Sequence, residues 1–120
     1  LKPLIKKMKK VLGEQVKDVK ASSRLKDSPS CIVADSNDPT AKMQELMKTM
    51  GQPGQQDIKP ILEINPSHAI IIKLKNMKKS KSFDDISQLL LDQAVLLEGA
   101  KLKNPTDFVD RLNTILTESL

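Results

Sequence analysis

The stretch SQLLLDQAVLLEGA, residues 87–100, constrains the fold more strongly than any other part of the sequence. A surface helix in a small domain usually carries one apolar stripe, and its opposite side is polar. In this stretch apolar residues fall on nearly every side, and only Gln88 and Asp92 mark a narrow polar strip. The sequence therefore predicts a helix that must be covered from more than one direction.

Two coverings are compatible with this helix, which we expect over residues 83–99. It can be buried all round inside a single chain. Alternatively, one side packs on its own domain, and the other joins the helices of a second copy in a two-fold symmetric four-helix bundle. Periodicity leaves both open, because Leu91 and Val95 point nearly opposite to the larger apolar side. That larger side consists of Ile86, Leu89, Leu90, Gln93 and Leu97, with Phe83, Ala94 and Leu96 at its borders.

A last helix is predicted over residues 106–118. Asn104-Pro105 is a typical helix start, because Asn accepts hydrogen bonds from free backbone N–H groups and Pro needs no donor at the first position. The apolar side of this helix adds to the surface that needs a cover. That side consists of Phe108, Leu112 and Ile115, with Val109 and Leu116 beside them.

The remaining elements predict an α+β fold for the 120 residues, which is a length typical of one domain. A small three-stranded sheet packed with helices would occupy residues 1–78, and a C-terminal helical segment would occupy residues 82–118. The first two strands are candidates for a hairpin, although the loop between them is long. Helical spacing predicts helices over 3–12, 39–50 and 66–78, and runs of β-branched or small residues predict strands over 16–22, 30–35 and 60–65.

Short signals predict where these helices begin and end. Gly13 stands where a helix end needs a left-handed residue. Asn65-Pro66 repeats the cap-then-proline start at the third helix. Ser82 and Asp85 match a capping box, in which a side chain at each end of the first turn satisfies a free backbone N–H group.

A narrow stripe made almost entirely of methionine runs along AKMQELMKTMG, residues 41–51. One interpretation is an ordinary stripe that faces a core. The other is an exposed, adaptable contact surface for unfolded or partner chains, because flexible thioether side chains suit promiscuous contacts. The narrowness of the stripe and the flexible sequences around it argue for the second interpretation. The stripe consists of Met43, Leu46, Met47 and Met50.

Composition argues against several classes of partner. The net charge of +5 would suit nucleic acid, but Trp and Tyr are absent and Phe occurs twice, so bases have few side chains to stack on. No apolar run is long enough to span a membrane, and no secretory signal pattern opens the chain. We therefore expect no nucleic-acid partner, no membrane partner and a cytoplasmic location.

Residues for catalysis or metal binding are not recognisable in the sequence. Cys31 is the single cysteine, so it cannot form an internal disulfide, and no Cys/His cluster offers a zinc site. No phosphate loop, nucleophile elbow or dinucleotide fingerprint is present. His68, the single histidine, lies near a predicted helix start, where hydrogen bonding to the backbone is favoured over catalysis. We expect no catalytic residue, no metal ligand and no cofactor in this chain.

Four segments follow one another in an informative order: VLGEQVKDVKAS (11–22), RLKDSPSCIVAD (24–35), ILEINPSHAII (61–71) and LLLDQAVLLEGAKLKNPTDFVDRLNTIL (89–116). Each is moderately specific by itself, and the four together are much more so. The chain resembles, over nearly its whole length, the C-terminal domain of the ninety-kilodalton heat-shock chaperones, and it is most similar to their bacterial HtpG branch.

The resemblance implies a three-domain chaperone driven by ATP. ATP and Mg²⁺ would bind an N-terminal domain that, like the middle domain, is not in this chain; a start at Leu1 rather than Met fits a piece of a longer protein. The C-terminal domain would join two protomers through its last helices, and helix 39–50 would project between them and contact unfolded client proteins. The implied dimer contacts are Leu89, Leu90, Leu96, Leu97, Phe108, Leu112, Ile115 and Leu116, and the implied client contacts are Met43, Leu46, Met47 and Met50.

Departures from the eukaryotic pattern indicate a bacterial type. The chain ends Thr-Glu-Ser-Leu rather than Met-Glu-Glu-Val-Asp, so we do not expect helical-repeat co-chaperones as partners. The segment NDPTAKM also lacks the Trp that often precedes the projecting helix in eukaryotic relatives. The resulting expectation is a homodimerisation domain that also contacts clients and performs no chemistry. The alternative is a freestanding dimeric interaction module that uses the methionine stripe as a docking surface.

Overall fold

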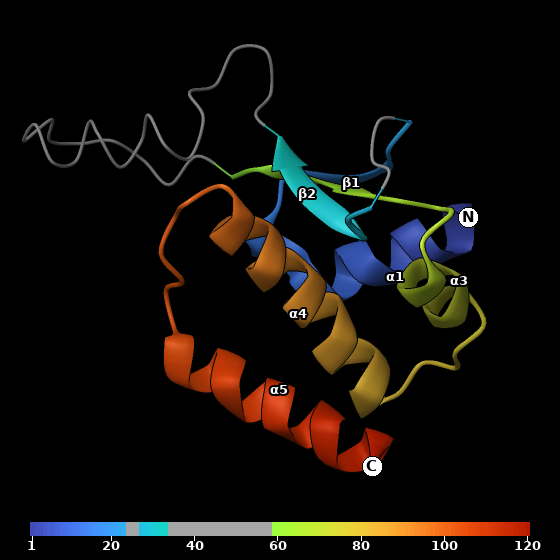
Figure 1. Ribbon diagram of the computed structural model, residues 1–120. Helices are drawn as coiled ribbons and strands as arrows, with labels where there is room; N and C mark the ends of the chain where they lie inside the picture. Colours follow the sequence, from blue (N-terminus) through green and yellow to red (C-terminus); the bar gives the residue numbers. More distant parts are fainter. Residues whose placement is uncertain (24–26, 34–58) are drawn as a thin grey trace, which may run out of the picture.

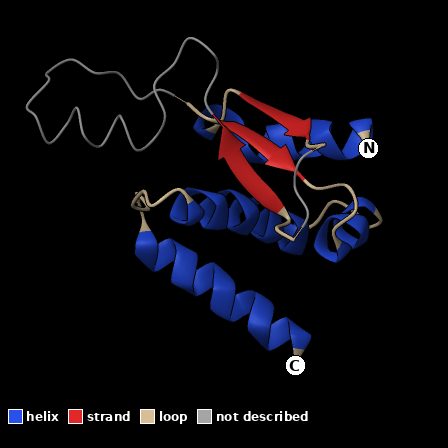
Figure 2. Cartoon of the chain, turned by 45° about the horizontal axis from the view of Figure 1, so that its top comes forward, coloured by secondary structure: helices blue, strands red, loops and turns tan. Residues whose placement is uncertain are grey.

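A three-stranded sheet with helices packed against it makes up the part of the chain that the computed structural model describes, residues 1–23, 27–33 and 59–120 (Figure 1). Helices α1 and α4 lie against the sheet, and α5 lies on the far side of α4 (Figures 1 and 2). The α+β fold with a small three-stranded sheet is therefore confirmed. The described elements are α1 (Lys2–Leu12), the short 3-10 helix η1 (Gly13–Gln15), β1 (Asp18–Ala21), β2 (Ser30–Val33), β3 (Ile61–Ile64), α3 (Ala69–Lys75), α4 (Lys81–Leu97) and α5 (Pro105–Ser119).

The strand order is β1-β3-β2, so the last strand in the sequence lies in the middle. β3 pairs parallel with β1, where Val19 is opposite Leu62, and antiparallel with β2, where Ile32 is opposite Leu62. The predicted hairpin between the first two strands is wrong, because β1 and β2 are not neighbours. β3 is the most apolar of the three strands, and the central position buries three of its four residues.

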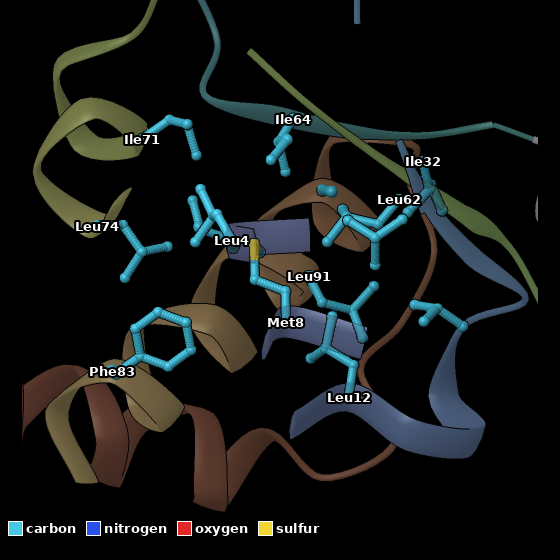
Figure 3. Packing of buried hydrophobic residues seen from close by; sticks show 14 residues of the cluster. Leu4, Met8, Leu12, Ile32, Leu62, Ile64, Ile71, Leu74, Phe83 and Leu91 are labelled. Atoms are coloured by element: carbon cyan, nitrogen blue, oxygen red, sulfur yellow. The ribbon is translucent and has the colours of Figure 1, made fainter. Parts of the chain in front are cut away.

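The core lies between the sheet and the helices α1, α3 and α4 (Figure 3). Alternate strand residues point into it, as the two-residue period of a strand requires. One side of α1 packs into this core, because its apolar residues follow helical spacing and share one side. The lysines of α1 stay exposed. The largest fully buried hydrophobic side chains are Met8, Leu12, Leu62, Ile64, Ile71, Leu74 and Phe83.

The first helix ends as predicted. Gly13 follows α1 with a φ of +53°, a backbone conformation that L side chains rarely adopt. Its N–H group donates to the carbonyl oxygen of Lys9, which satisfies one of the free carbonyls at the helix end. Gly99, with a φ of +81°, stands in the same way just beyond α4.

The start of α3 differs from the prediction. Asn65 is buried at the end of β3, where its side chain accepts from the N–H of Ser67 and donates to the carbonyl oxygen of Ser28. These bonds form a turn rather than a helix cap. The helix begins instead after His68, whose Nδ1 accepts from the N–H of Ile70 at 3.1 Å. The hydrogen-bonding role expected for His68 is confirmed.

The start of α4 also differs. The capping residue is Ser80, whose Oγ accepts from the N–H of Phe83 at 3.2 Å, so the helix begins at Lys81 rather than at residue 83. The predicted capping box of Ser82 and Asp85 is wrong. Both side chains are used elsewhere: the Ser82 hydroxyl donates to Glu118, and Asp85 pairs with Lys81.

Two fully buried serines lie where α4 packs on the sheet, and their hydroxyl groups differ in whether they have a hydrogen-bond partner. The hydroxyl of Ser30 in β2 donates to the carbonyl oxygen of Leu90 at 2.8 Å and so joins the sheet to α4. The hydroxyl of Ser87 in α4 has no hydrogen-bond partner among the described residues. A buried polar group without a partner costs about 1–3 kcal/mol of stability.

Replacing Ser87 by Ala should therefore stabilise the protein. We expect the free energy of unfolding to rise by about 1 kcal/mol, because the variant removes an unsatisfied hydroxyl and improves helix propensity. Ser30→Ala is the matched control and should lower it by about 1 kcal/mol, since it deletes a satisfied hydrogen bond. Urea unfolding followed by circular dichroism at one fixed protein concentration measures both. A Ser87→Ala variant as unstable as Ser30→Ala would contradict this account.

Candidate dimerisation surface

The inner side of α4 belongs to the chain's own core. Phe83, Ser87, Leu90, Leu91 and Ala94 are buried there, and the helix contacts both β2 and α1. Figure 3 shows Phe83 and Leu91 among the core side chains that come from the other elements. This packing covers one side of the helix, and its other apolar residues need further contacts.

α5 covers a second side of α4 (Figure 1). Arg111 and Glu118 of α5 point toward α4: the Arg111 Nε atom lies 3.7 Å from Asp85 Oδ1, and Glu118 accepts from the Ser82 hydroxyl at 2.8 Å. Phe108 and Ile115 are partly buried. None of the α5 side chains, all of which the structure describes, is fully buried.

Exposed apolar side chains gather on this helical tail. Leu96 and Leu97 end α4, and the side chain of Leu97 is 66% exposed. On α5, and at Leu120 directly after it, the exposed apolar residues recur at helical spacing and form one stripe, which we call the outer stripe. Two further exposed isoleucines, Ile70 and Ile72, lie on α3. The outer stripe consists of Val109, Leu112, Leu116 and Leu120.

A small charged cluster lies between α4 and α5. Asp85 is only 8% exposed, and its carboxylate also pairs with Lys81 Nζ at 3.0 Å. Asp92, two turns further along α4, is partly buried. Burial raises the pKa of Asp92 above its ordinary value, while a hydrogen bond from Gln88 and the positive charge of Arg111 act in the opposite direction. Arg111 therefore interacts with carboxylates at two levels of α4.

The predicted contact residues fall into three groups. Leu96, Leu97, Leu112 and Leu116 are exposed. Leu89, Phe108 and Ile115 are partly buried. Leu90 is different, because it is 3% exposed within the chain's own core and presents no surface to a second copy, so it is removed from the candidate surface.

Two residues of the outer stripe were not among the predicted contacts. Val109 had been placed only beside the apolar side of the last helix. Leu120 follows Leu116 by four residues, and this spacing could have indicated it. The client contacts Met43, Leu46, Met47 and Met50 lie outside the described residues.

Comparison with known proteins identifies the family. A model of the family described as "Hsp90 protein" matches residues 1–120. The chain belongs to the Hsp90 family. Among relatives named "Chaperone protein HtpG", it is 50% identical to that of Treponema denticola over 116 residues and 47% identical to that of Legionella pneumophila over 119 residues.

The Hsp90-family chain spans only a small part of these relatives. The matches cover 97% of the chain but 18% of the Treponema denticola protein, and 99% of the chain but 19% of the Legionella pneumophila protein. The HtpG chaperone of Vesicomyosocius okutanii is matched over a similar share, with 50% identity over 94% of the chain and 18% of that protein. The similarity to bacterial HtpG chaperones thus concerns one portion of a longer polypeptide.

The described residues also bear on metal binding and on membrane crossing. In the described ranges, three or more His, Cys, Asp or Glu side chains do not come together in a group that could hold a metal ion. Within those same ranges, no helix combines the length and the apolar character needed to cross a membrane.

The raised pKa of Asp92 predicts a pH-dependent effect of its replacement. The folded state holds the Asp92 proton more tightly than the unfolded state does, so the ionised carboxylate lowers stability once the pH exceeds its raised pKa. Asp92→Asn should therefore raise the midpoint of urea unfolding at pH 7. This gain should shrink as the pH falls to the ordinary pKa of aspartate, where the carboxyl is neutral in both states.

Asp110→Asn on the exposed side of α5 is the matched control for this measurement. It removes the same charge from a solvated position and should change the midpoint little at either pH. A loss of stability in Asp92→Asn at pH 7 would mean that attraction to Arg111 outweighs the cost of burial.

Proposed function

We propose that this chain is the C-terminal dimerisation domain of an ATP-dependent chaperone of the HtpG type. The observation that carries the proposal is the outer stripe of α5, where Leu112 is 38% and Leu116 is 49% exposed although the helix is otherwise docked on its domain. Apolar surface that follows helical spacing and faces solvent is typical of a helix that packs against a partner.

The proposed partner is a second copy of the chain. α4 and α5 of one protomer would pack against α4 and α5 of the other and form a four-helix bundle with two-fold symmetry. The outer stripe would then meet its own counterpart and the exposed leucines at the end of α4. Membership of the Hsp90 family and the similarity to HtpG chaperones support this arrangement.

The role of such a joint is geometric. Two protomers held together at one end keep their other domains at high effective concentration, so that closure of those domains becomes an intramolecular event. ATP and Mg²⁺ would act in an N-terminal domain outside these 120 residues. The residues of this chain would contribute binding and orientation, and the location would be the cytoplasm.

Client contact is the second part of the proposed role. Helix 39–50, with its methionine stripe, would lie next to the joint and hold unfolded chains by adaptable apolar contacts. The sequence pattern is what supports this part of the proposal. Residues 39–50 lie outside the described residues.

The dimer is tested by placing charges in the outer stripe. Leu112→Asp combined with Leu116→Asp should convert the dimer to a monomer over a dilution series in sedimentation velocity, because carboxylates in the bundle would be desolvated without partners. We expect the dissociation constant to rise at least a hundredfold. The circular dichroism spectrum should be unchanged, since neither side chain belongs to the core.

Ile70→Asp combined with Ile72→Asp is the matched control for the dimer. These α3 side chains are 41% and 47% exposed, so the control makes the same chemical change at the same exposure on another helix. The control should remain dimeric. An unsubstituted chain that stays monomeric at high concentration, or a stripe variant that still dimerises, would rule the proposal out.

The client role is tested by making the methionine stripe polar. Met43→Ser, Met47→Ser and Met50→Ser together should weaken the binding of a permanently unfolded model client at least fivefold and leave the dimer intact. Glu45→Ser with Lys48→Ser, on the other predicted side of the helix, should change binding little. Fluorescence anisotropy of the labelled client measures both. Equal affinities in all three proteins would remove client contact from this helix.

A further inference from the structure

α5 presents charged as well as apolar side chains to its own domain and leaves several large apolar side chains exposed to solvent. The side that faces α4 carries Arg111 and Glu118 together with Phe108 and Ile115. The outer stripe, in contrast, is apolar along its whole length. Within one copy of the chain this orientation leaves large leucine side chains in water that a rotated helix could bury.

Apolar packing within one chain therefore does not by itself select the orientation of α5, because apolar residues lie both on the side that faces α4 and in the outer stripe. At about 100° per residue, Leu116 lies about 140° around the helix from Arg111. A rotation of that size would place Leu116 against α4 and turn the partly buried Phe108 and Ile115 toward solvent, so it would exchange one set of apolar contacts for another. The same rotation would turn Arg111 away from α4, so the two contacts exclude each other.

Arg111 opposes this rotation because of the carboxylates that it faces. It is the only basic residue in the sequence of α5. Asp85 is almost completely buried, and rotation would leave its charge with Lys81 as its one cationic partner among the described residues. Asp92, already penalised by burial, would lose the attraction of the same guanidinium group. Separating a buried carboxylate from its cation is strongly unfavourable.

A second polar contact lies further along the same side of α5. Glu118 accepts from the Ser82 hydroxyl at 2.8 Å, seven residues and about 10 Å of helix beyond Arg111. Two contacts at different heights on one side of a helix define its rotation about its own axis. Ile115 lies between them and fills the space with a partly buried apolar side chain.

We infer that Arg111 is a positioning residue for the dimer: its ion pair with Asp85 holds α5 in the rotation that presents the outer stripe to the second copy. The inference rests on the proposed dimerisation and names a residue that acts on the joint without belonging to the stripe. Polar contacts inside each protomer thus decide which apolar surface is available between protomers.

The first test compares dissociation constants. Arg111→Met removes the charge and keeps most of the apolar side chain, and it should raise the dissociation constant of the dimer at least tenfold. Arg111→Lys, which keeps a positive charge, should recover part of the loss. Lys78→Met removes one charge from an exposed position between α3 and α4 and should leave the dissociation constant within twofold of the unsubstituted chain.

A double-mutant cycle separates positioning from general support of the fold. Leu116→Ala should weaken the dimer of the unsubstituted chain clearly, but it should add little to Arg111→Met, because the stripe of that variant no longer faces the partner. If Leu116→Ala weakens both proteins by the same factor, or if Arg111→Met leaves the dimer unchanged, the inference is overturned while the proposed dimer stands.

A third measurement needs no dimer. In a Cys31→Ala background, the thiol of Leu116→Cys should react quickly with iodoacetamide when the protein is diluted to monomers. Adding Arg111→Met should slow this reaction severalfold, because the helix rotates and the thiol turns toward α4. Equal reaction rates with and without Arg111 would overturn the inference, and this holds even if the chain is always monomeric. A chain that is always monomeric would separately contradict the proposed function.

Discussion

The packing of the inner side of α4 against β2 and α1 is the contact on which the rest of the structure depends. It contributes Phe83, Leu90, Leu91 and Ala94 to a core that also receives residues of all three strands. α5 has α4 as its main neighbour, so its position relative to the sheet is determined through this one helix. Loss of that packing would release the whole helical tail together with the surface that it presents.

Different forces operate on successive layers of the molecule. Between the sheet and α4 the contact is apolar, with the Ser30 hydroxyl bonded to the carbonyl oxygen of Leu90 as a polar link. Between α4 and α5 charged and hydroxyl groups provide the directional contacts. On the outside of α5 the outer stripe again presents apolar side chains. A polar layer between two apolar ones gives α5 a defined orientation, which apolar contacts by themselves specify poorly because they are not directional.

Within the described residues, periodicity was sufficient to predict the helices and strands but not the pairing of the strands. The apolar residues of α1, α4 and α5 follow helical spacing closely, and the Asn104-Pro105 start of α5 is confirmed. Spacing along one strand, however, contains no information about which strand lies beside it. The parallel neighbour of β1 is β3, about forty residues away, and only the strongly apolar sequence ILEI hinted that β3 would be central.

The candidate surface was predictable to a similar degree. Helical spacing and the family resemblance identified the exposed leucines of α4 and α5, but spacing did not separate Leu90, which the core takes, from its neighbours. The contact between Arg111 and Asp85 joins residues of two helices and depends on how the helices cross, which neither sequence segment encodes by itself. The predicted capping box was wrong for a related reason. Ser82 and Asp85 use their side chains for contacts with Glu118 and Lys81 instead.

The register of the sheet has a consequence for how such a chain can diverge. Val33 at the end of β2 is paired with Ile61 at the start of β3, so the segment between them departs and returns at one site on the sheet border. The entropic cost of closing a longer connection grows only slowly with its length. Changes of length or sequence between these two residues therefore cost the sheet little and leave the packing of α4 on the sheet and of α5 on α4 unaffected.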